Sequence, residues 1–487
     1  MKRLCPVVCL GVFAGLALTL VLQTACTSAK SDEVPITTKS AEARRLYIEG
    51  RDQMEFYHGE KANALFKRAF ELDPDFALAQ FLYGATSSDM ATWQANITQS
   101  FALAAKASVG EQKLIAGQQA LVMERDAVKA NRIYQELAAL FPKDKRIHWY
   151  LASTYGNMNE FDKQMAELEA AIALDKSFAP PYETLGYIYR WRTQYDKAEA
   201  AFKEYARLSP KEANSHDILG DLYMKMGKFE DAIREYEAAV RMDPTFIFSQ
   251  QKVGSSLIFL GRYDEARQAF LKAMDLPVKE VNKVDDQDGI KRTYIYEGDY
   301  AKALEATDKN IELALKLGVP ASASYNHLVK GVVYCHLGDY DKADACIDEG
   351  LTALEATDLL QSVKDNQKIQ ATFVRIMVAA GRKNFDKAQA LADSFKTQLA
   401  AVNNPAIQKE ADWALGYIAL ARGDAAKAIE HFSQGEMDDP FIMYHFALAK
   451  EQAGDAGGAT ELYKKLANWN EDNVWYGFVR AKALAKL

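Results

Sequence analysis

Cysteine is scarce in this chain of 487 residues, which contains five. Two of them lie in an apolar N-terminal stretch and a third, Cys26, follows it, so that only Cys335 and Cys346 remain for the folded part. We expect this pair in one helix hairpin, offset by about one helical turn (~6 Å of rise), a geometry that disfavours a disulfide. The sequence therefore predicts two buried free thiols.

The sequence also lacks the motifs of common catalytic and metal sites. Its seven histidines are scattered, with no HExxH spacing and no GxSxG elbow. Cys335, His336 and Cys346 lack a second pair of ligands, so a packed helix is favoured over a metal site. We therefore predict a non-enzymatic protein with no cofactor and no metal.

Strand-like alternation and basic stripes are absent as well. Helix-forming residues dominate, and no segment alternates apolar and polar residues over a sustained length, which favours an all-α fold. The net charge of −8 and the pI of about 5.6 argue against nucleic-acid binding, because no basic stripe could neutralise phosphates.

A 34-residue period runs through the chain. Pro74, Pro142, Pro210 and Pro244 are 68, 68 and 34 residues apart, all multiples of 34. Between Pro142 and Pro210 the period predicts one further proline, at position 176, where the chain has Lys176. Such a period is typical of stacked helix-turn-helix repeats, in which a proline stops the second helix of each unit.

Within each period, large and small residues recur at helical spacing. The segment 213–246 carries Leu219, Gly220, Tyr223, Ala232, Tyr236, Ala239 and Pro244. Spacings of three, four and seven place the large residues on one stripe of each helix. Gly220 and Ala232 allow two antiparallel helices to approach closely, and we expect Tyr223 and Tyr236 to fill the space between neighbouring units.

This pattern resembles the tetratricopeptide repeat family over most of residues 41–467. The resemblance implies an all-α, right-handed superhelical solenoid of about twelve units, starting near residues 43, 77, 111, 145, 179, 213, 247, 284, 324, 369, 409 and 440. We predict a regular superhelix over 41–276 and longer, looser units over 284–467, where extra residues lengthen the second helices and the loops. A closing helix, Val474–Leu487, is expected to cap the stack.

The N-terminus is predicted to be a targeting segment. Lys2 and Arg3 precede the apolar stretch Leu4–Leu22, and Cys26 follows. Residues 1–25 resemble a bacterial lipoprotein signal, which implies that Cys26 is acylated and becomes the first residue of the mature chain. Residues 26–40 would then be a polar tether.

Two alternatives to lipidation stay open at this end. Gln23 stands where lipoprotein signals usually have leucine. The apolar stretch could instead remain as an uncleaved membrane anchor, or ordinary signal peptidase could cut after Ala25 or Ala29. All three alternatives export the repeats, and the lipoprotein prediction places them at the outer membrane, facing the periplasm.

The resemblance also implies a concave groove lined by the first helix of each unit. By register, the predicted partner-binding residues are Arg146, Trp149, Glu183, Tyr187, Arg190, Asn214, Asp217, Asp221 and Gln251. The same register continues through Phe248, Asp288, Arg292, Trp413 and Tyr417. Aromatic side chains mixed with charges and amides suit an extended peptide, although a shift of one position would bury each aromatic side chain between units.

The leading functional prediction is therefore a protein–protein interaction scaffold, exported and tethered to a bacterial envelope membrane. The alternative is a binding module for envelope glycan or peptidoglycan fragments, which would require a stacked row of exposed aromatic side chains such as Trp149, Tyr187 and Phe248. An enzyme has little room, because repeats occupy nearly the whole mature chain.

Overall fold

The computed structural model describes residues 32–487 except 57, 278, 403–404 and 436–438. The predicted signal, Leu4–Leu22 within it and Cys26 lie outside the described residues. Among the helices that are described, none combines the length and the apolar character needed to cross a membrane.

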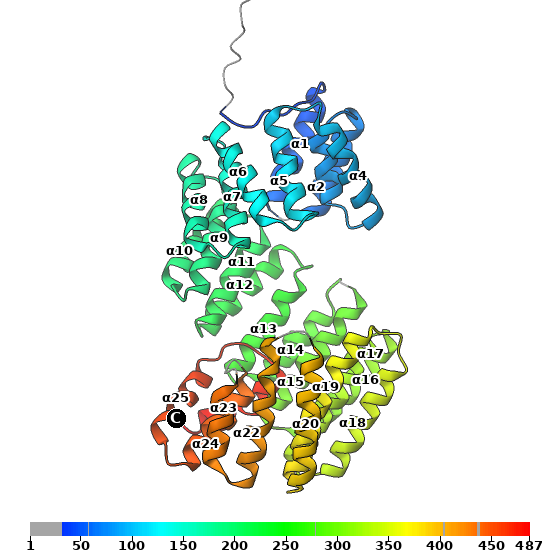
Figure 1. The fold of residues 1–487 in the computed structure, drawn as a ribbon, viewed down its shortest axis with the longest axis vertical. Helices are drawn as coiled ribbons and strands as arrows, with labels where there is room; N and C mark the ends of the chain where they lie inside the picture. The colour runs from blue at the N-terminus through cyan, green and yellow to red at the C-terminus, as the bar shows by residue number, and fades with distance from the viewer. Residues whose placement is uncertain (1–31, 57, 278, 403–404, 436–438) are drawn as a thin grey trace, which may run out of the picture. The chain divides into compact units, whose positions relative to one another are not determined.

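The chain divides into two compact units between Asp175 and Lys176. We call them the N-terminal unit and the C-terminal unit. The N-terminal unit holds eight helices in its described residues (Figure 1): α1 (Ala41–Glu55), α2 (Gly59–Leu72), α3 (Ala77–Ala85), α4 (Met90–Ala104), α5 (Val109–Val122), α6 (Ala127–Leu140), α7 (Lys145–Asn157) and α8 (Phe161–Leu174).

The C-terminal unit contains the remaining helices of the described chain. Its earlier hairpins are built from α9 (Pro180–Trp191), α10 (Tyr195–Leu208), α11 (Ala213–Lys225), α12 (Phe229–Met242), α13 (Ile247–Phe259), α14 (Tyr263–Met274), α15 (Lys283–Glu297) and α16 (Tyr300–Lys316). The later ones use α17 (Pro320–Leu337), α18 (Tyr340–Glu355), α19 (Gln361–Gly381), α20 (Phe385–Ala401), α22 (Glu410–Arg422), α23 (Ala425–Gln434), α24 (Pro440–Gln452) and α25 (Ala456–Ala467). Short pieces are η1 (Glu280–Asn282), α21 (Pro405–Gln408), α26 (Val474–Gly477) and α27 (Arg480–Leu484).

Consecutive long helices pair as hairpins, four in the N-terminal unit and eight in the C-terminal unit over the described residues. The prediction of an all-helical repeat fold is confirmed, and the hairpins begin within a few residues of the predicted unit starts, except α19, which begins eight residues earlier. The repeating prolines follow second helices as expected. Pro210 comes two residues after α10 ends, and Pro244 comes two residues after α12 ends.

Small residues on the first helix make room for an aromatic ring on the second. A Cβ atom added to Gly220 would lie 2.5 Å from the ring of Tyr236, and one added to Gly186 would lie 2.3 Å from the ring of Phe202. Ala232 has no exposed surface. The predicted close approach at Gly220 is present. The Tyr236 ring packs against Gly220 in its own hairpin, and Lys252 of the next hairpin lies 5.4 Å from the centroid of this ring.

The later hairpins are longer than the earlier ones, as the widened period requires. Helices α16, α17, α19 and α20 have 17, 18, 21 and 17 residues, against 13 and 14 in α11 and α12. The extra residues therefore lengthen first helices as well as second helices, whereas the sequence assigned them to second helices and loops.

Part of the predicted tether is held against the N-terminal unit. The backbone N–H groups of Val34, Thr37 and Lys39 donate hydrogen bonds of 3.0, 2.7 and 2.9 Å to carboxylates of Asp144, Glu111 and Asp73 respectively. Asp73 directly follows α2, Glu111 is on α5, and Asp144 directly precedes α7. Residues 34–39 are thus bound to the N-terminal unit by three backbone hydrogen bonds.

The two cysteines of the fold are free thiols. Cys346 is buried and Cys335 is partly buried. Burial raises the pKa of the Cys335 thiol to about 12 and that of Cys346 to about 11. Among the described residues, no three His, Cys, Asp or Glu side chains are grouped as ligands for a metal ion.

Candidate functional site

Seven of the predicted partner-binding residues lie on the first helices of adjacent hairpins in the C-terminal unit. Glu183, Tyr187 and Arg190 are on α9, Asn214, Asp217 and Asp221 are on α11, and Gln251 is on α13. These first helices carry the inner face of the unit. Several of them make polar contacts within the protein, either with one another or with Lys252 and Asp286.

The centre of this face is a charge network around Lys252, which we call the inner network. The Lys252 ammonium lies 2.9 Å from Asp217 and 2.7 Å from Asp221. Asp221 also accepts a hydrogen bond of 2.9 Å from the Tyr236 hydroxyl, and Ser249 donates one of 2.6 Å to Asp217. Burial lowers the pKa of Lys252, but the two carboxylates outweigh it and hold the pKa above its usual value. Asp217 and Asp221 are thus both paired with Lys252 inside the protein, so reversing their charges would also disturb the contact between α11 and α13.

Two further predicted residues bind buried acids. Asn214 donates a hydrogen bond of 3.2 Å to Glu183, which is only 4% exposed. Gln251 donates one of 2.7 Å to Asp286 on α15. Burial raises the pKa of Asp286 to about 6, with Gln251 opposing the shift. Amides on successive first helices therefore tie one repeat to the next.

A cavity of about 500 Å³ opens beside this network. It is lined by Tyr187, Arg190, Trp191, Thr193, Tyr195, Asp221, Met224, Lys225, Asn470 and Glu471. Trp191 is 67% exposed, and the Arg190 guanidinium lies 5.0 Å from the centroid of the Tyr187 ring. We call this cavity the Trp191 pocket.

The aromatic residues of this face differ in exposure and in their contacts. The rings of Phe202 and Tyr187 meet edge to face, with their centroids 5.2 Å apart. The Arg190 guanidinium covers one face of the Tyr187 ring. Phe248 is 62% exposed. Arg190 and Phe202 thus hold the Tyr187 ring within its own hairpin, which leaves it poorly suited to stack on a sugar.

Arg146 and Trp149 belong to the N-terminal unit and are considered within it alone. The Arg146 guanidinium donates a hydrogen bond of 2.6 Å to Glu55 on α1 and lies 3.5 Å from Asp52. The Arg146 side chain is 12% exposed and that of Glu55 8%. Burial raises the pKa of Glu55, and Arg146 opposes this shift. Trp149 is partly buried, with its ring 5.5 Å from that of Tyr150. Arg146 therefore joins α7 to α1.

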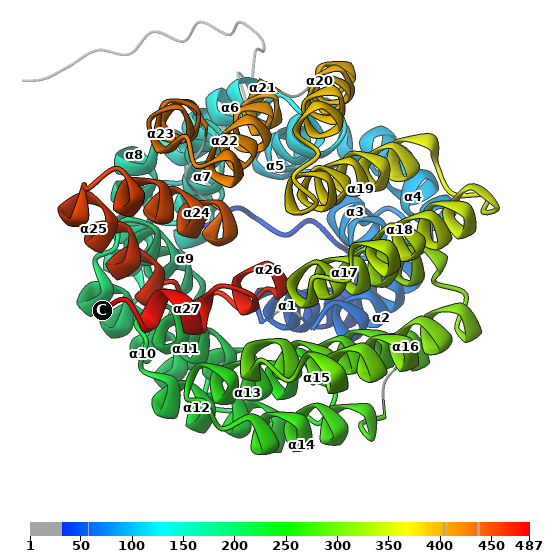
Figure 2. The same cartoon turned by 90° about the horizontal axis from the view of Figure 1, so that it is seen from below.

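The C-terminal segment, residues 468–487, crosses the inside of the C-terminal unit. The sequence predicts one capping helix over 474–487, and the structure has two short helices there, α26 and α27. Figure 2 shows both inside the curve formed by α13, α15, α17 and α24. The chain thus returns from the last hairpin to the early hairpins of the same unit.

Polar contacts fix this segment along α11, α13 and α15. The Asp472 carboxylate accepts hydrogen bonds of 2.8 Å from Ser255 and 3.1 Å from Arg292. Arg292 also donates one of 2.7 Å to Asp288. Glu471 meets Lys225 at 2.5 Å. The Asp472 side chain is 5% exposed, so its charge is neutralised inside the protein rather than by water.

Aromatic contacts hold the end of the segment. The ring of Tyr476 lies 6.3 Å from that of Phe259 and 6.1 Å from that of Tyr296. Phe478 stacks on His336 at 4.7 Å. Tyr476 is fully buried and Phe478 is 2% exposed. The inner face near α13 and α15 is therefore occupied by the protein's own chain.

His336 gives this packing a pH dependence. Burial lowers the pKa of His336 to about 3, and Lys482 and His445 add to the shift. An unfolded histidine takes up a proton below about pH 6.5, while the folded one stays neutral. The unfolded state thus binds more protons between about pH 3 and 6.5, and the unit loses stability as the pH falls through this window.

We expect His336→Phe to remove this loss. The change in the free energy of unfolding caused by the substitution should be more favourable at pH 5 than at pH 8, by about 1–2 kcal/mol. Phenylalanine keeps the stacking on Phe478 and cannot be protonated. Urea unfolding of both proteins at the two pH values measures the difference. An equal effect of the substitution at both values would contradict the assignment.

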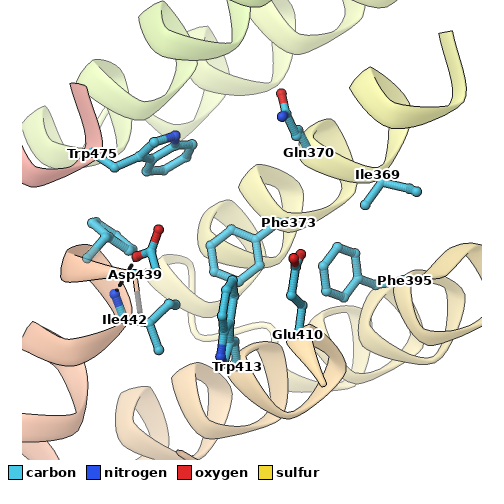
Figure 3. Close-up of a pocket in the computed structure, with 10 residues that line it drawn as sticks. Ile369, Gln370, Phe373, Phe395, Glu410, Trp413, Asp439, Ile442 and Trp475 are labelled. Atoms are coloured by element: carbon cyan, nitrogen blue, oxygen red, sulfur yellow. Dashed lines mark hydrogen bonds between the residues drawn. The ribbon is translucent and has the colours of Figure 1, made fainter. Parts of the chain in front are cut away.

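A second cavity lies among the later hairpins (Figure 3). It measures about 120 Å³ and is lined by Ile369, Gln370, Phe373, Phe395, Glu410, Trp413, Asp439, Phe441, Ile442 and Trp475. Trp413 was within the register of the predicted groove, whereas Trp475 comes from α26. We call this cavity the aromatic pocket.

Sequence reasoning missed the partners of several predicted residues. Lys252 lies one residue beyond Gln251 and carried no repeat signal. Asp472 and Trp475 stand outside the 34-residue period, so no register could assign them to the inner face. The sequence showed only that Asp472 is acidic, that Trp475 is aromatic, and that Trp475 stands in the segment expected to cap the stack.

The tetratricopeptide repeat family matches residues 146–178, 213–246 and 249–277. These segments coincide with the hairpins α7–α8, α11–α12 and α13–α14. No curated protein matches the sequence.

Three solved structures are similar over part of the chain. MamA is 25% identical, with a TM-score of 0.32, over 34% of this chain and 90% of MamA. YrrB, described as a TPR protein with an unusual peptide-binding site, is 23% identical, with a TM-score of 0.31, over 37% of this chain and 91% of YrrB. The C-terminal part of a TPR repeat-containing protein from Cytophaga hutchinsonii is 16% identical, with a TM-score of 0.40, over 50% of this chain and 96% of that structure.

Proposed function

Because residues 146–178, 213–246 and 249–277 are tetratricopeptide repeats, we propose that this chain is a non-enzymatic protein-binding scaffold, exported and tethered to a bacterial envelope membrane. Stacked helical repeats build extended inner surfaces, and such surfaces serve as binding faces. The partner is a protein or peptide that meets the inner face of the C-terminal unit.

The Trp191 pocket is the observation that carries this proposal. It combines a mostly exposed tryptophan with Arg190 and Asp221 on neighbouring first helices. Tryptophan and arginine are typical anchors of protein interfaces. The pocket lies beside the inner network, which fixes Asp221, and beside the C-terminal segment, which supplies Asn470 and Glu471. A rigid rim of this kind lowers the entropic cost of binding.

The tether adds a constraint on where the partner can be met. If Cys26 carries the lipid, the chain from Cys26 to Val34 spans at most about 29 Å when extended. Since Val34 is bound to Asp144, the N-terminal unit would be held close to the membrane surface. Intact-mass analysis of the membrane-extracted protein tests this part: loss of residues 1–25 with added lipid supports it, and an unlipidated N-terminus at Cys26 or Lys30 contradicts it.

Trp191→Ala is expected to lower partner capture at least fivefold while leaving the fold intact, because exposed substitutions usually change stability by less than about 0.5 kcal/mol. Capture is measured with p-benzoylphenylalanine in place of Tyr195, which lines the same pocket, by irradiating cells and identifying the cross-linked protein.

Leu315→Ala is the matched control, since Leu315 is 54% exposed on α16 and does not line this pocket. A cross-link that forms equally well in Trp191→Ala, or that needs Leu315 instead, would contradict the assignment of the binding face.

A further inference from the structure

The aromatic pocket combines two kinds of group that attract a cation. Of its lining residues, Phe373, Phe395, Trp413, Phe441 and Trp475 are aromatic. The faces of such rings carry negative electrostatic potential and attract ammonium and guanidinium groups, tryptophan most strongly. Figure 3 shows the Trp413 and Phe373 side chains reaching into the space between the helices, with Trp475 on its far side.

The charged side chains among the described residues that line the pocket have one sign. Glu410 and Asp439 are the charged residues of the lining, and both are acidic. Asp439 is oriented by a hydrogen bond of 2.9 Å from the backbone N–H of Ile442, which it caps. Figure 3 places Glu410 between Phe373 and Phe395. A neutral apolar guest would meet the rings but would also lie against two carboxylates, whereas a cation is attracted by both.

The size of the pocket selects a single side chain. Its volume of about 120 Å³ is close to that of a cavity that accepts one benzene molecule, roughly 150 Å³. Ile369 and Ile442 offer apolar contact for a methylene stem, the part of lysine and arginine that packs on apolar surface while the head stays polar. A folded domain or an oligosaccharide is too large to enter.

The C-terminal segment completes the pocket. Trp475 meets Phe441 edge to face at 5.3 Å, and its neighbours Asp472 and Tyr476 are fixed to α13 and α15 by the contacts described above. These contacts hold Trp475 in place before a ligand arrives. A side chain that is already ordered loses less entropy on binding.

We propose that the aromatic pocket binds the cationic side chain of a lysine or arginine in the partner. This inference rests on the proposed function and names the chemistry of one anchor of that partner. It predicts partners with an exposed basic residue, recognised by Glu410, Asp439 and the rings of Trp413 and Trp475.

Fluorine NMR of the full chain labelled with 5-fluorotryptophan tests the proposal. The protein has six tryptophans, and Trp413→Phe and Trp475→Phe assign their two resonances. The probes are the N-acetyl N-methylamides of lysine and arginine, each compared with its neutral analogue, norleucine or citrulline. The Trp413 and Trp475 resonances should shift saturably with the basic probes, and binding of the neutral analogues should be at least tenfold weaker.

Charge-removing variants separate attraction by the carboxylates from apolar contact. Glu410→Gln should weaken binding of the basic probes about fivefold, and Asp439→Asn, which keeps a capping side chain, should do the same. Glu305→Gln, on an exposed residue of α16, is the control and should change nothing.

The proposal is overturned if norleucine binds as tightly as lysine, if neither carboxylate variant weakens binding, or if the two resonances stay fixed up to the solubility limit of the probes. These outcomes are distinguishable from failure of the proposed function, because cross-linking at Tyr195 reports on the Trp191 pocket and uses no basic probe.

Discussion

Arg292→Met should destabilise the C-terminal unit by about 3–5 kcal/mol, the usual cost of removing one partner from a buried ion pair. Arg292 joins Asp472 of the C-terminal segment to Asp288 of α15. Its loss would leave the Asp472 carboxylate, 5% exposed, with the Ser255 hydroxyl and no cation. Native-state hydrogen exchange of α13 and α15 measures the effect without requiring the whole chain to unfold in one step.

A second substitution tests whether charge is the reason. Asp472→Asn alone should cost less, because Arg292 keeps Asp288 as its partner. In the Arg292→Met background, Asp472→Asn should restore at least about 1 kcal/mol, since it removes a buried charge that has lost its cation. If the two losses simply add, Arg292 acts through packing and the ion-pair explanation is wrong.

Removing residues 468–487 should have a larger effect still. Val474, Tyr476, Phe478 and Val479 are each at most 6% exposed. Full burial of a large apolar side chain is worth about 1.5–3 kcal/mol, so the protection of α13, α15 and α17 against exchange should fall by more than about 5 kcal/mol. The truncation would also uncover Tyr296 and His336.

Three proteins make this test decisive. Truncation after Ala485 removes Lys486, with its surface ion pair to Glu451, and the exposed Leu487, and should be almost neutral. Tyr476→Ala is the variant to use if the longer truncation fails to accumulate, and should cost about 3–5 kcal/mol. Unchanged protection of α13 and α15 in both Tyr476→Ala and the long truncation would show that the segment does not support the inner face. Protection of α1 and α5, in the N-terminal unit, serves as the internal reference.

Local packing within each hairpin followed from the sequence because the repeat encodes it in residues close together. The close approach at Gly220 was predicted. The ring that fills it, that of Tyr236, stands sixteen positions later on the second helix of the same hairpin and was assigned from the sequence to the space between units. The same register placed Asp217, Asp221 and Trp413 on inner faces or pockets. The register did not specify whether the carboxylates of Asp217 and Asp221 would face a partner or bind Lys252, because Lys252 belongs to the next hairpin.

The sequence by itself determined that the repeat region is a series of helical hairpins, where most of them begin to within a few residues, and which residues stand on the first helices. Those properties arise from helix periodicity, glycine and alanine at crossings, and proline after second helices, all local effects. Only the tertiary structure decided what occupies the inner face of the C-terminal unit. Arg292 and Asp472 are 180 positions apart, outside any common register, and they meet because the later hairpins curve back far enough for the last residues to reach α13 and α15.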